Sequence, residues 1–339
     1  MKILVVGPSW VGDAVMAQSL YKIISRNGEQ IEVLSPTWSE GILSRMSEVR
    51  DTIISPFKHG EFSLRKRKSL GVSLQNRGYD QAIILTNSLK SSLVPFFANI
   101  PQRTGWLGEF RYGLINDVRY FNKNTNSLMI EQFSVLGPKG EIFKNEDIPY
   151  PRLNIDLINL EKLKNKFKIQ DKEPIIALCP GAEFGPAKRW PVSYYSVIAE
   201  EYLSQGWTVI ILGSERDALI AKEIEASVSL ECNLYNLAGK TSLVDAVDIL
   251  SFANIVLTND SGLMHIAAAV ETPLVALYGP TSPNFTPPLN IKARVIKKTS
   301  GFSKKRTGKM ENGYDFGLYD IKPQEVLFEL ESLRDTLDD

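Results

Sequence analysis

Residues 7 to 13, GPSWVGD, place two glycines at the spacing of a phosphate-binding loop but put an aspartate where that loop needs a lysine. The apolar run ILVV comes directly before them and a helix-like stretch follows, which is typical of a strand-to-helix turn. In a P-loop the lysine after the second glycine reaches the phosphates. Because Asp13 would repel a phosphate and the pattern GxGxxG is absent, this turn is not expected to hold a nucleotide.

Two roles are open for Asp13. A helix N-terminus carries about half a positive charge, so a carboxylate there can simply stabilise the first turn of the helix. The other role is that of a general base, which takes the proton from a reacting hydroxyl. A helix N-terminus favours the charged form of a carboxylate and so weakens it as a base, whereas partial burial would have the opposite effect.

A second strand-to-helix turn, CPGAEFGPAKRWP at residues 179 to 191, carries two glycines and a Lys-Arg pair. Backbone N–H groups of a glycine turn, together with the Lys188 ammonium, could hold a diphosphate. Lys188 could equally be a solvated cation at the end of a loop.

A third turn, TNDSGLMHIAAA at residues 258 to 269, places Asp260, Ser261 and Gly262 at another helix N-terminus. Such an end is a ready anion site. His265, on the helix that follows, either donates a hydrogen bond to a phosphate or sugar hydroxyl or is an ordinary packed histidine.

A base candidate in the first half and two anion sites in the second half suggest a nucleotide-activated donor that meets an acceptor. The chain has no Asp-x-Asp motif of the kind that chelates a metal for nucleotide sugars. We therefore expect Lys188 and helix N-termini, rather than Mg²⁺ or another cofactor, to offset the phosphate charge.

Apolar runs of strand length alternate with helix-like segments in both halves of the chain, which predicts two doubly wound, Rossmann-like α/β domains. Ligands of open α/β sheets bind beyond the carboxyl ends of the strands, so a cleft between the domains is expected. The polar stretch 138–173 is interpreted as a linker with one helix. The expected strands are residues 2–7, 31–36, 51–56, 81–87 and 103–106, then 174–181, 208–213, 233–239, 255–260 and 273–279.

Composition excludes several classes of protein. The net charge is zero, so bulk charge does not indicate a nucleic-acid partner. No apolar run approaches the roughly 18 residues of a membrane span, and the first apolar run is too short for a signal peptide. Cys179 and Cys232 lack metal-ligand spacing and are expected to be reduced, so a cytoplasmic protein is predicted.

Four ordered motifs, GPSWVGD, PGAEFGPAKRWP, NDSGLMH and VALYGPTSPNFTPPL, together resemble the bacterial ADP-heptose:lipopolysaccharide heptosyltransferases. The segment NSLKSSLVPFFANIPQRTGWLGEFRYGLIND resembles them too. The second and third motifs resemble the branch that adds the second heptose more than the branch that adds the first. The resemblance runs from residue 1 to about residue 330 and is weakest between 138 and 173.

This resemblance implies an inverting, metal-independent glycosyltransferase of the GT-B fold. It implies an acceptor domain at residues 1–160 and an ADP-sugar domain at 173–321. The final helix, 322–339, is expected to pack back on the first domain by analogy with that fold.

The resemblance also implies roles for individual residues. The family's base falls on Asp13 and its diphosphate lysine on Lys188, which we also count as catalytic. An acidic residue that meets the ribose should be Glu215 or Asp217, and the sequence does not choose between them. The remaining donor-site residues implied are Asp260, Ser261, Gly262, Leu263 and His265.

The implied acceptor is the first heptose of the lipopolysaccharide inner core, carried on Kdo and lipid A. Candidate contacts are Ser9, Trp10 and Gly12 in the first turn and the cations Lys90, Arg103 and Arg111. The basic runs 65–68 and 304–306 could touch anionic headgroups on the cytoplasmic face of the inner membrane, or be solvated faces. The alternatives are a sister heptosyltransferase with another acceptor, a nucleotide-sugar epimerase of the same fold, and a non-catalytic nucleotide-sugar binding protein.

Overall fold

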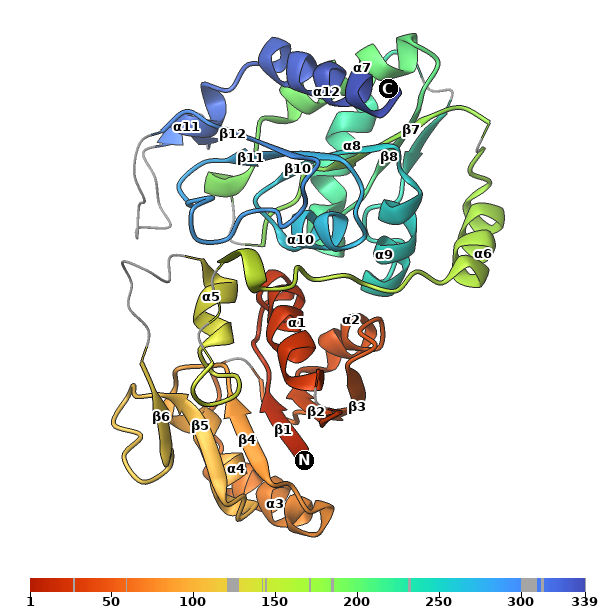
Figure 1. The fold of residues 1–339 in the computed structure, drawn as a ribbon. Helices are drawn as coiled ribbons and strands as arrows, with labels where there is room; N and C mark the ends of the chain where they lie inside the picture. The colour runs from red at the N-terminus through yellow and green to blue at the C-terminus, as the bar shows by residue number, and fades with distance from the viewer. Residues whose placement is uncertain are drawn as a thin grey trace. The chain divides into compact units, whose positions relative to one another are not determined.

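The computed structural model divides into two compact units, Met1–Pro151 and Arg152–Asp339, each with its own parallel sheet (Figure 1). It describes residues 1–338 except positions 27, 59, 121–127, 142, 144, 171, 184–185, 231–232, 300–309 and 312–313. The second basic run, 304–306, and Cys232 lie outside the described residues. None of the described helices combines the length and apolarity needed to cross a bilayer.

The first unit is built on a six-stranded sheet in the order β3-β2-β1-β4-β5-β6, with all neighbours parallel. The chain starts at the centre, runs outward to β3, then returns to the centre and runs outward to β6. The order therefore reverses between β1 and β4. The strands are β1 (Lys2–Val6), β2 (Gln30–Ser35), β3 (Val49–Ile54), β4 (Gln81–Ile84), β5 (Gln102–Trp106) and β6 (Asp117–Arg119).

Helices cover both faces of this sheet. The side chains of Leu4 and Val6 pack with Leu74 and Val94 in one buried cluster, on the face covered by α3 and α4. Helix α1 packs against α5, and their buried residues include Leu20 and Phe133. The helices are α1 (Val11–Ser25), α2 (Glu40–Leu43), α3 (Leu64–Leu74), α4 (Leu93–Phe97) and α5 (Met129–Ser134).

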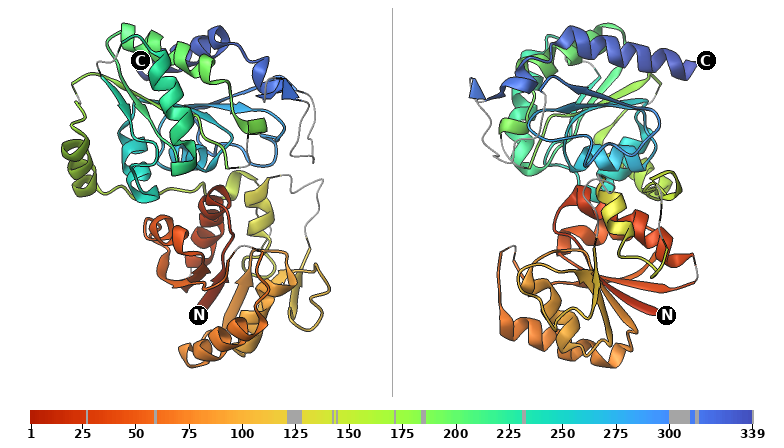
Figure 2. Two further views of the ribbon diagram at one scale, coloured as in Figure 1. Left: turned by 180° about the vertical axis from the view of Figure 1, so that it is seen from behind. Right: turned by 60° about the vertical axis from the view of Figure 1, so that its left-hand side comes forward.

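The second unit repeats this topology with six further parallel strands, in the order β12-β11-β10-β7-β8-β9 (Figure 2). Its order reverses between β7 and β10. The strands are β7 (Ile175–Cys179), β8 (Thr208–Ile211), β9 (Leu234–Asn236), β10 (Ile255–Asn259), β11 (Leu274–Tyr278) and β12 (Ala293–Lys297).

Helices α9 and α10 pack together, and α7 and α8 do so on the opposite side of the second sheet (Figure 1). A two-stranded hairpin, β13 (Met310–Glu311) and β14 (Tyr314–Asp315), comes before the last two helices. The helices are α6 (Leu157–Phe167), α7 (Val192–Ser204), α8 (Ala218–Ser227), α9 (Leu243–Phe252), α10 (Gly262–Ala269), α11 (Phe316–Tyr319) and α12 (Pro323–Asp338).

The position of α12 differs from the expectation that it would return to the first domain. Its apolar side chains Val326, Leu330 and Leu333 join the core of the second unit. It packs there against α7, β11 and β12. The Trp190 indole donates a hydrogen bond of 2.9 Å to the Ile321 carbonyl and ties the chain before α12 to the same unit.

The prediction of two doubly wound α/β folds is confirmed, and each of the ten expected strands is present within a few residues of its expected bounds. Helix α6 lies in the stretch that was interpreted as a linker with one helix. Two edge strands, β6 and β12, were missed. Both have half-exposed, partly charged sequences, DVR and ARVIK, that lack the continuous apolar run of a buried strand.

Candidate functional site

In each unit, some of the candidate residues lie in the turns after the two strands where the strand order reverses. This is where open α/β sheets bind their ligands. In the first unit the turn after β1 carries Asp13, and the loop after β4 carries Lys90. In the second unit the turn after β7 leads to Lys188, and the turn after β10 carries Asp260.

Lys188 and Asp260 form an ion pair that joins the turn after β7 to the turn after β10. The Lys188 ammonium lies 2.6 Å from Oδ2 of Asp260, and their side chains are 17% and 8% exposed. The Thr281 hydroxyl, from the turn after β11, donates to the same oxygen at 2.5 Å. The Asp260 carboxylate therefore holds a cation at the strand ends, 72 residues away in the chain.

Asn259, the last residue of β10, holds the two loops in register. Its amide Nδ2 donates to the Pro180 carbonyl at 2.7 Å. Its Oδ1 accepts from the backbone N–H of Trp190 and from the Tyr195 hydroxyl, each at 3.2 Å. The Asn259 side chain is fully buried and fixes the backbone on both sides of Lys188. Asn259 and Thr281 were not predicted as site residues, although Asn259 lies in the motif NDSGLMH and Thr281 in VALYGPTSPNFTPPL.

His265 lies one turn into α10, next to the ion pair, and is 6% exposed. Burial lowers its pKa to about 4; the charge of Asp260 opposes this shift and that of Lys188 adds to it. The imidazole is therefore neutral at pH 7, with one nitrogen that can donate a hydrogen bond and one that can accept.

The first turn of α10 faces the same region. Ser261 is the N-cap residue, with extended backbone, and Gly262 and Leu263 open the helix. All three are partly exposed. Since the first four N–H groups of an α-helix have no partner within the helix, this end offers donors and a partial positive charge to an anion.

Glu215 and Asp217 have different surroundings in the structure. The Asp217 carboxylate accepts from the backbone N–H of Ser214 at 3.0 Å and from its hydroxyl at 2.7 Å. Arg189 lies 3.4 Å away, and a Cβ at Gly181 would approach the carboxylate to 2.5 Å. Asp217 thus fills a fitted space as a helix cap, whereas Glu215 is exposed to solvent.

In the first unit, Asp13 is the third residue of α1 and is partly exposed. The N-cap Trp10 has extended backbone, and its carbonyl accepts from the N–H of Ala14 at 2.9 Å. Ser9, Trp10 and Gly12 are also partly exposed around this turn. A Cβ at Gly7 would meet the Val33 side chain at 3.1 Å, so glycine lets the chain leave β1 close beside β2.

Arg111, predicted as an acceptor contact, is fully buried and serves the protein itself. Its guanidinium donates to the carbonyls of Thr86 and Trp106 and, at 2.9 Å, to the side-chain oxygen of Asn87. Burial lowers its pKa to about 10, and the Glu109 charge opposes this shift. Arg111 therefore joins the loops after β4 and β5.

Arg103 is likewise engaged by its own chain. Its guanidinium donates to the carbonyls of Leu114 and Ile100, each at 2.7 Å, and lies over the Phe96 ring. Lys90 is partly exposed in the short helix Leu89–Ser92. Of the three predicted acceptor cations, Lys90 is the one whose charged group is not committed to a hydrogen bond described in the structure.

Within the described residues, no group of three or more His, Cys, Asp or Glu side chains is arranged to hold a metal ion. Cys179 is fully buried at the end of β7, and burial raises the pKa of its thiol. It is a packing residue beneath the Lys188 loop.

A family model described as glycosyltransferase family 9 (heptosyltransferase) matches residues 67–314. The chain is 48% identical to lipopolysaccharide heptosyltransferase 2 of Escherichia coli K12 and 47% identical to that of Salmonella typhimurium LT2, over 98% of each chain. The solved structure of E. coli ADP-heptose LPS heptosyltransferase II is 43% identical, covers the whole of both chains and gives a TM-score of 0.90.

Proposed function

This chain belongs to glycosyltransferase family 9, the heptosyltransferases, and we propose that it transfers L-glycero-D-manno-heptose from ADP-heptose to the first heptose of the lipopolysaccharide inner core. Full-length identity near one half with relatives named heptosyltransferase 2 supports the choice of acceptor. The single observation that carries the proposal is the Lys188–Asp260–Thr281 cluster beside the open N-terminus of α10.

The donor occupies the second unit in this proposal. The diphosphate lies at the first turn of α10, where Ser261, Gly262 and Leu263 offer backbone N–H groups. Lys188 has three protons to donate, so it can keep Asp260 and still reach a phosphate oxygen. Neutral His265 donates to a phosphate or sugar hydroxyl, and exposed Glu215 accepts from the ribose hydroxyls.

Asp13 acts as the general base in the first unit. The acceptor hydroxyl oxygen forms a bond to the anomeric carbon from the face opposite ADP, and its proton passes to the Asp13 carboxylate. The bond from that carbon to the diphosphate breaks, and its electron pair leaves with ADP, so the configuration inverts. A general base typically contributes about 10²–10⁴-fold.

The charge that gathers on the leaving ADP is stabilised by Lys188 and α10 rather than by a metal ion. Preorganised cations and helix N-termini are effective here because they need not reorganise as the reaction proceeds. Transfer should therefore continue unchanged in EDTA. Loss of activity that added Mg²⁺ restores would contradict the metal-free mechanism.

The acceptor occupies the first unit, near Ser9, Trp10, Gly12 and Lys90. Since it is carried on lipid A, we place the reaction in the cytoplasm at the inner face of the inner membrane. Arg111 and Arg103 act indirectly, because they hold the loops after β4 and β5 in place.

Mass-detected transfer from ADP-heptose to two acceptors, Kdo-lipid A with and without its first heptose, tests this function. We expect transfer to the heptose-bearing acceptor alone. Transfer to the bare Kdo acceptor would identify a sister enzyme with a different acceptor. Free sugar formed without any acceptor would indicate an epimerase instead.

A further inference from the structure

Helix α3 and the turn after it form a strongly basic segment on a protein of zero net charge. Residues 64–78 contain five cations, at positions 65–68 and 77, and no acidic residue. The helix lies beside α4 on the outside of the first unit (Figure 1). None of the steps proposed for transfer uses it.

The rotation of α3 is fixed by contacts on its inner face. Arg67 is 7% exposed and donates to the carbonyls of Phe62 at 2.6 Å, Glu61 at 2.9 Å and Lys90 at 3.1 Å. Its guanidinium also lies 4.0 Å from the centre of the Phe57 ring. One of the four consecutive cations is therefore a structural group, and its neighbours are turned outward.

The outward face of α3 alternates apolar and basic side chains. Leu64, Lys68 and Val72 follow one another at four-residue spacing, which places them on one row along the helix. Arg65 lies beside this row, and Phe62 comes just before the helix. Phe62, Leu64 and Val72 are 51%, 46% and 48% exposed, and the two cations are exposed as well. We call these five residues the α3 ridge.

We propose that the α3 ridge docks the protein on the anionic surface of a lipid bilayer. Each basic residue near such a surface contributes about 1 kcal/mol, and apolar side chains between the cations gain by entering the headgroup boundary. This inference rests on the proposed function, in which the acceptor is anchored in a membrane by lipid A. Docking would hold the first unit, which binds that acceptor, at the membrane surface.

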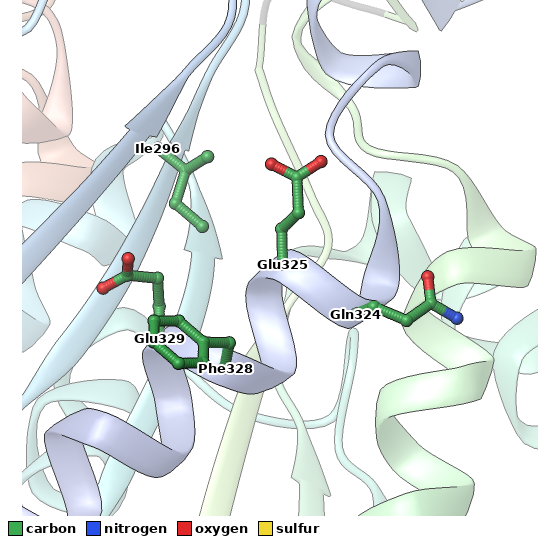
Figure 3. Close-up of a pocket in the computed structure, with 5 residues that line it drawn as sticks. All are labelled: Ile296, Gln324, Glu325, Phe328 and Glu329. Atoms are coloured by element: carbon green, nitrogen blue, oxygen red, sulfur yellow. The ribbon is translucent and has the colours of Figure 1, made fainter.

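The second unit also exposes an aromatic side chain, but its neighbours are acidic rather than basic. Phe328 of α12 is 68% exposed, which is more than Phe62. It lines a shallow pocket together with Ile296, Glu325 and Glu329 (Figure 3). The carboxylates would be repelled by an anionic surface, so Phe328 provides a matched control for loss of an exposed aromatic side chain.

Sedimentation with vesicles that contain no acceptor tests the docking surface directly. We expect the protein to bind vesicles of phosphatidylglycerol and phosphatidylethanolamine and to dissociate from them in high salt. It should not bind vesicles of pure phosphatidylcholine. The double variant Arg65→Ser/Lys68→Ser should bind about 30-fold more weakly, because two contributions of about 1 kcal/mol are lost. Leu64→Ser/Val72→Ser should also bind more weakly, and Phe328→Ser should bind like the unaltered protein.

Equal binding by all variants, or equal binding to neutral vesicles, would overturn the proposal. These side chains are exposed, so the variants should keep their thermal unfolding midpoints. Transfer to a delipidated heptose–Kdo oligosaccharide should keep its kcat/KM in both ridge variants, while transfer to vesicle-borne acceptor should fall. A fall with the delipidated acceptor would assign the ridge to sugar binding instead.

Failure of the proposed function is separable from failure of docking. If the unaltered protein transfers heptose to neither acceptor, the function is wrong, and the vesicle measurement still decides whether the ridge binds lipid.

Discussion

Asp13 and Asp260 each lie in a turn beside the strand reversal of their own sheet, yet their surroundings differ. Each follows a strand next to the reversal of its sheet, β1 in the first unit and β10 in the second. Asp260 precedes its helix, is 7% exposed and is bound by Lys188 and Thr281. Asp13 lies inside the first turn of α1 and is partly open to solvent.

The difference in exposure and in bound partners suits the two carboxylates to different tasks. A carboxylate committed to a lysine and a threonine is fitted to hold a cation in place. A partly exposed carboxylate at a helix start can receive a proton from a ligand that enters. The following predictions test whether Asp13 acts in the chemical step and the Asp260 cluster in donor binding.

Asp13→Ala should have the largest effect. Turnover should fall by about 10²–10⁴-fold, because the reacting hydroxyl loses its proton acceptor. Affinity for ADP-heptose, measured by calorimetry, should change little. The matched control Asp51→Ala removes an exposed acid of the first unit and should leave turnover intact. Collapse of donor binding in Asp13→Ala would place Asp13 in the donor site and remove the contrast with Asp260.

Lys188→Ala should weaken donor binding and turnover together. A hydrogen bond to a charged group is worth about 1.5–3 kcal/mol, so donor affinity should fall by roughly 10- to 150-fold. Lys298→Ala, which removes an exposed cation paired with Glu325 in the same unit, is the control. Full activity in Lys188→Ala would exclude the lysine from the mechanism.

Acidification should destabilise the second unit before the first. The pKa of His265 is about 4 in the folded protein, against an ordinary value of 6.5. Below pH 6.5 the unfolded chain therefore binds a proton at this residue more readily than the folded protein does. The stability from neutral His265 is complete above that value and declines as the pH falls toward 4. Each unit of pKa shift corresponds to about 1.4 kcal/mol, so at pH 5 the loss should be about 2 kcal/mol.

The first unit contains a group that responds only at lower pH. Burial would raise the pKa of Glu32, but hydrogen bonds from Lys2, Tyr79 and Arg77 outweigh burial and bring it to about 2. That stability is lost only as the pH falls below about 4.5. The free energy of unfolding, measured in urea, should therefore fall less between pH 7 and pH 5 for His265→Gln than for the unaltered protein. Equal losses would show that the acid sensitivity lies elsewhere.

Glu215→Ala and Asp217→Ala should separate ligand binding from capping, with the smallest effects of the set. Glu215→Ala should weaken ADP affinity by about 0.5–1.5 kcal/mol through one lost hydrogen bond, at unchanged thermal stability. Asp217→Ala should lower the free energy of unfolding by about 0.5–2 kcal/mol, as for other lost helix caps. Reversed effects would assign the ribose to Asp217.

The strands could be predicted because their signal is local. Runs such as ILVV and IIALC are buried on both faces of a parallel sheet and are continuously apolar. β12 escaped prediction because an edge strand is covered less fully and tolerates Arg294 and Lys297. The same reasoning explains why the turns that carry Asp13, Lys188 and Asp260 were found, since each follows such a run directly.

The sequence by itself determined which strand-to-helix turns exist and which charged residues stand in them, because both depend on neighbours a few positions away. Only the tertiary structure decided which of those charges the protein uses internally. Arg111 reaches the loop after β4, Arg67 reaches the Lys90 carbonyl, and Lys188 pairs with Asp260 over 23 to 72 residues of chain. Packing also placed α12 on the second unit. A buried charge takes whichever partners the fold brings within about 3 Å, and no local pattern in the sequence records them.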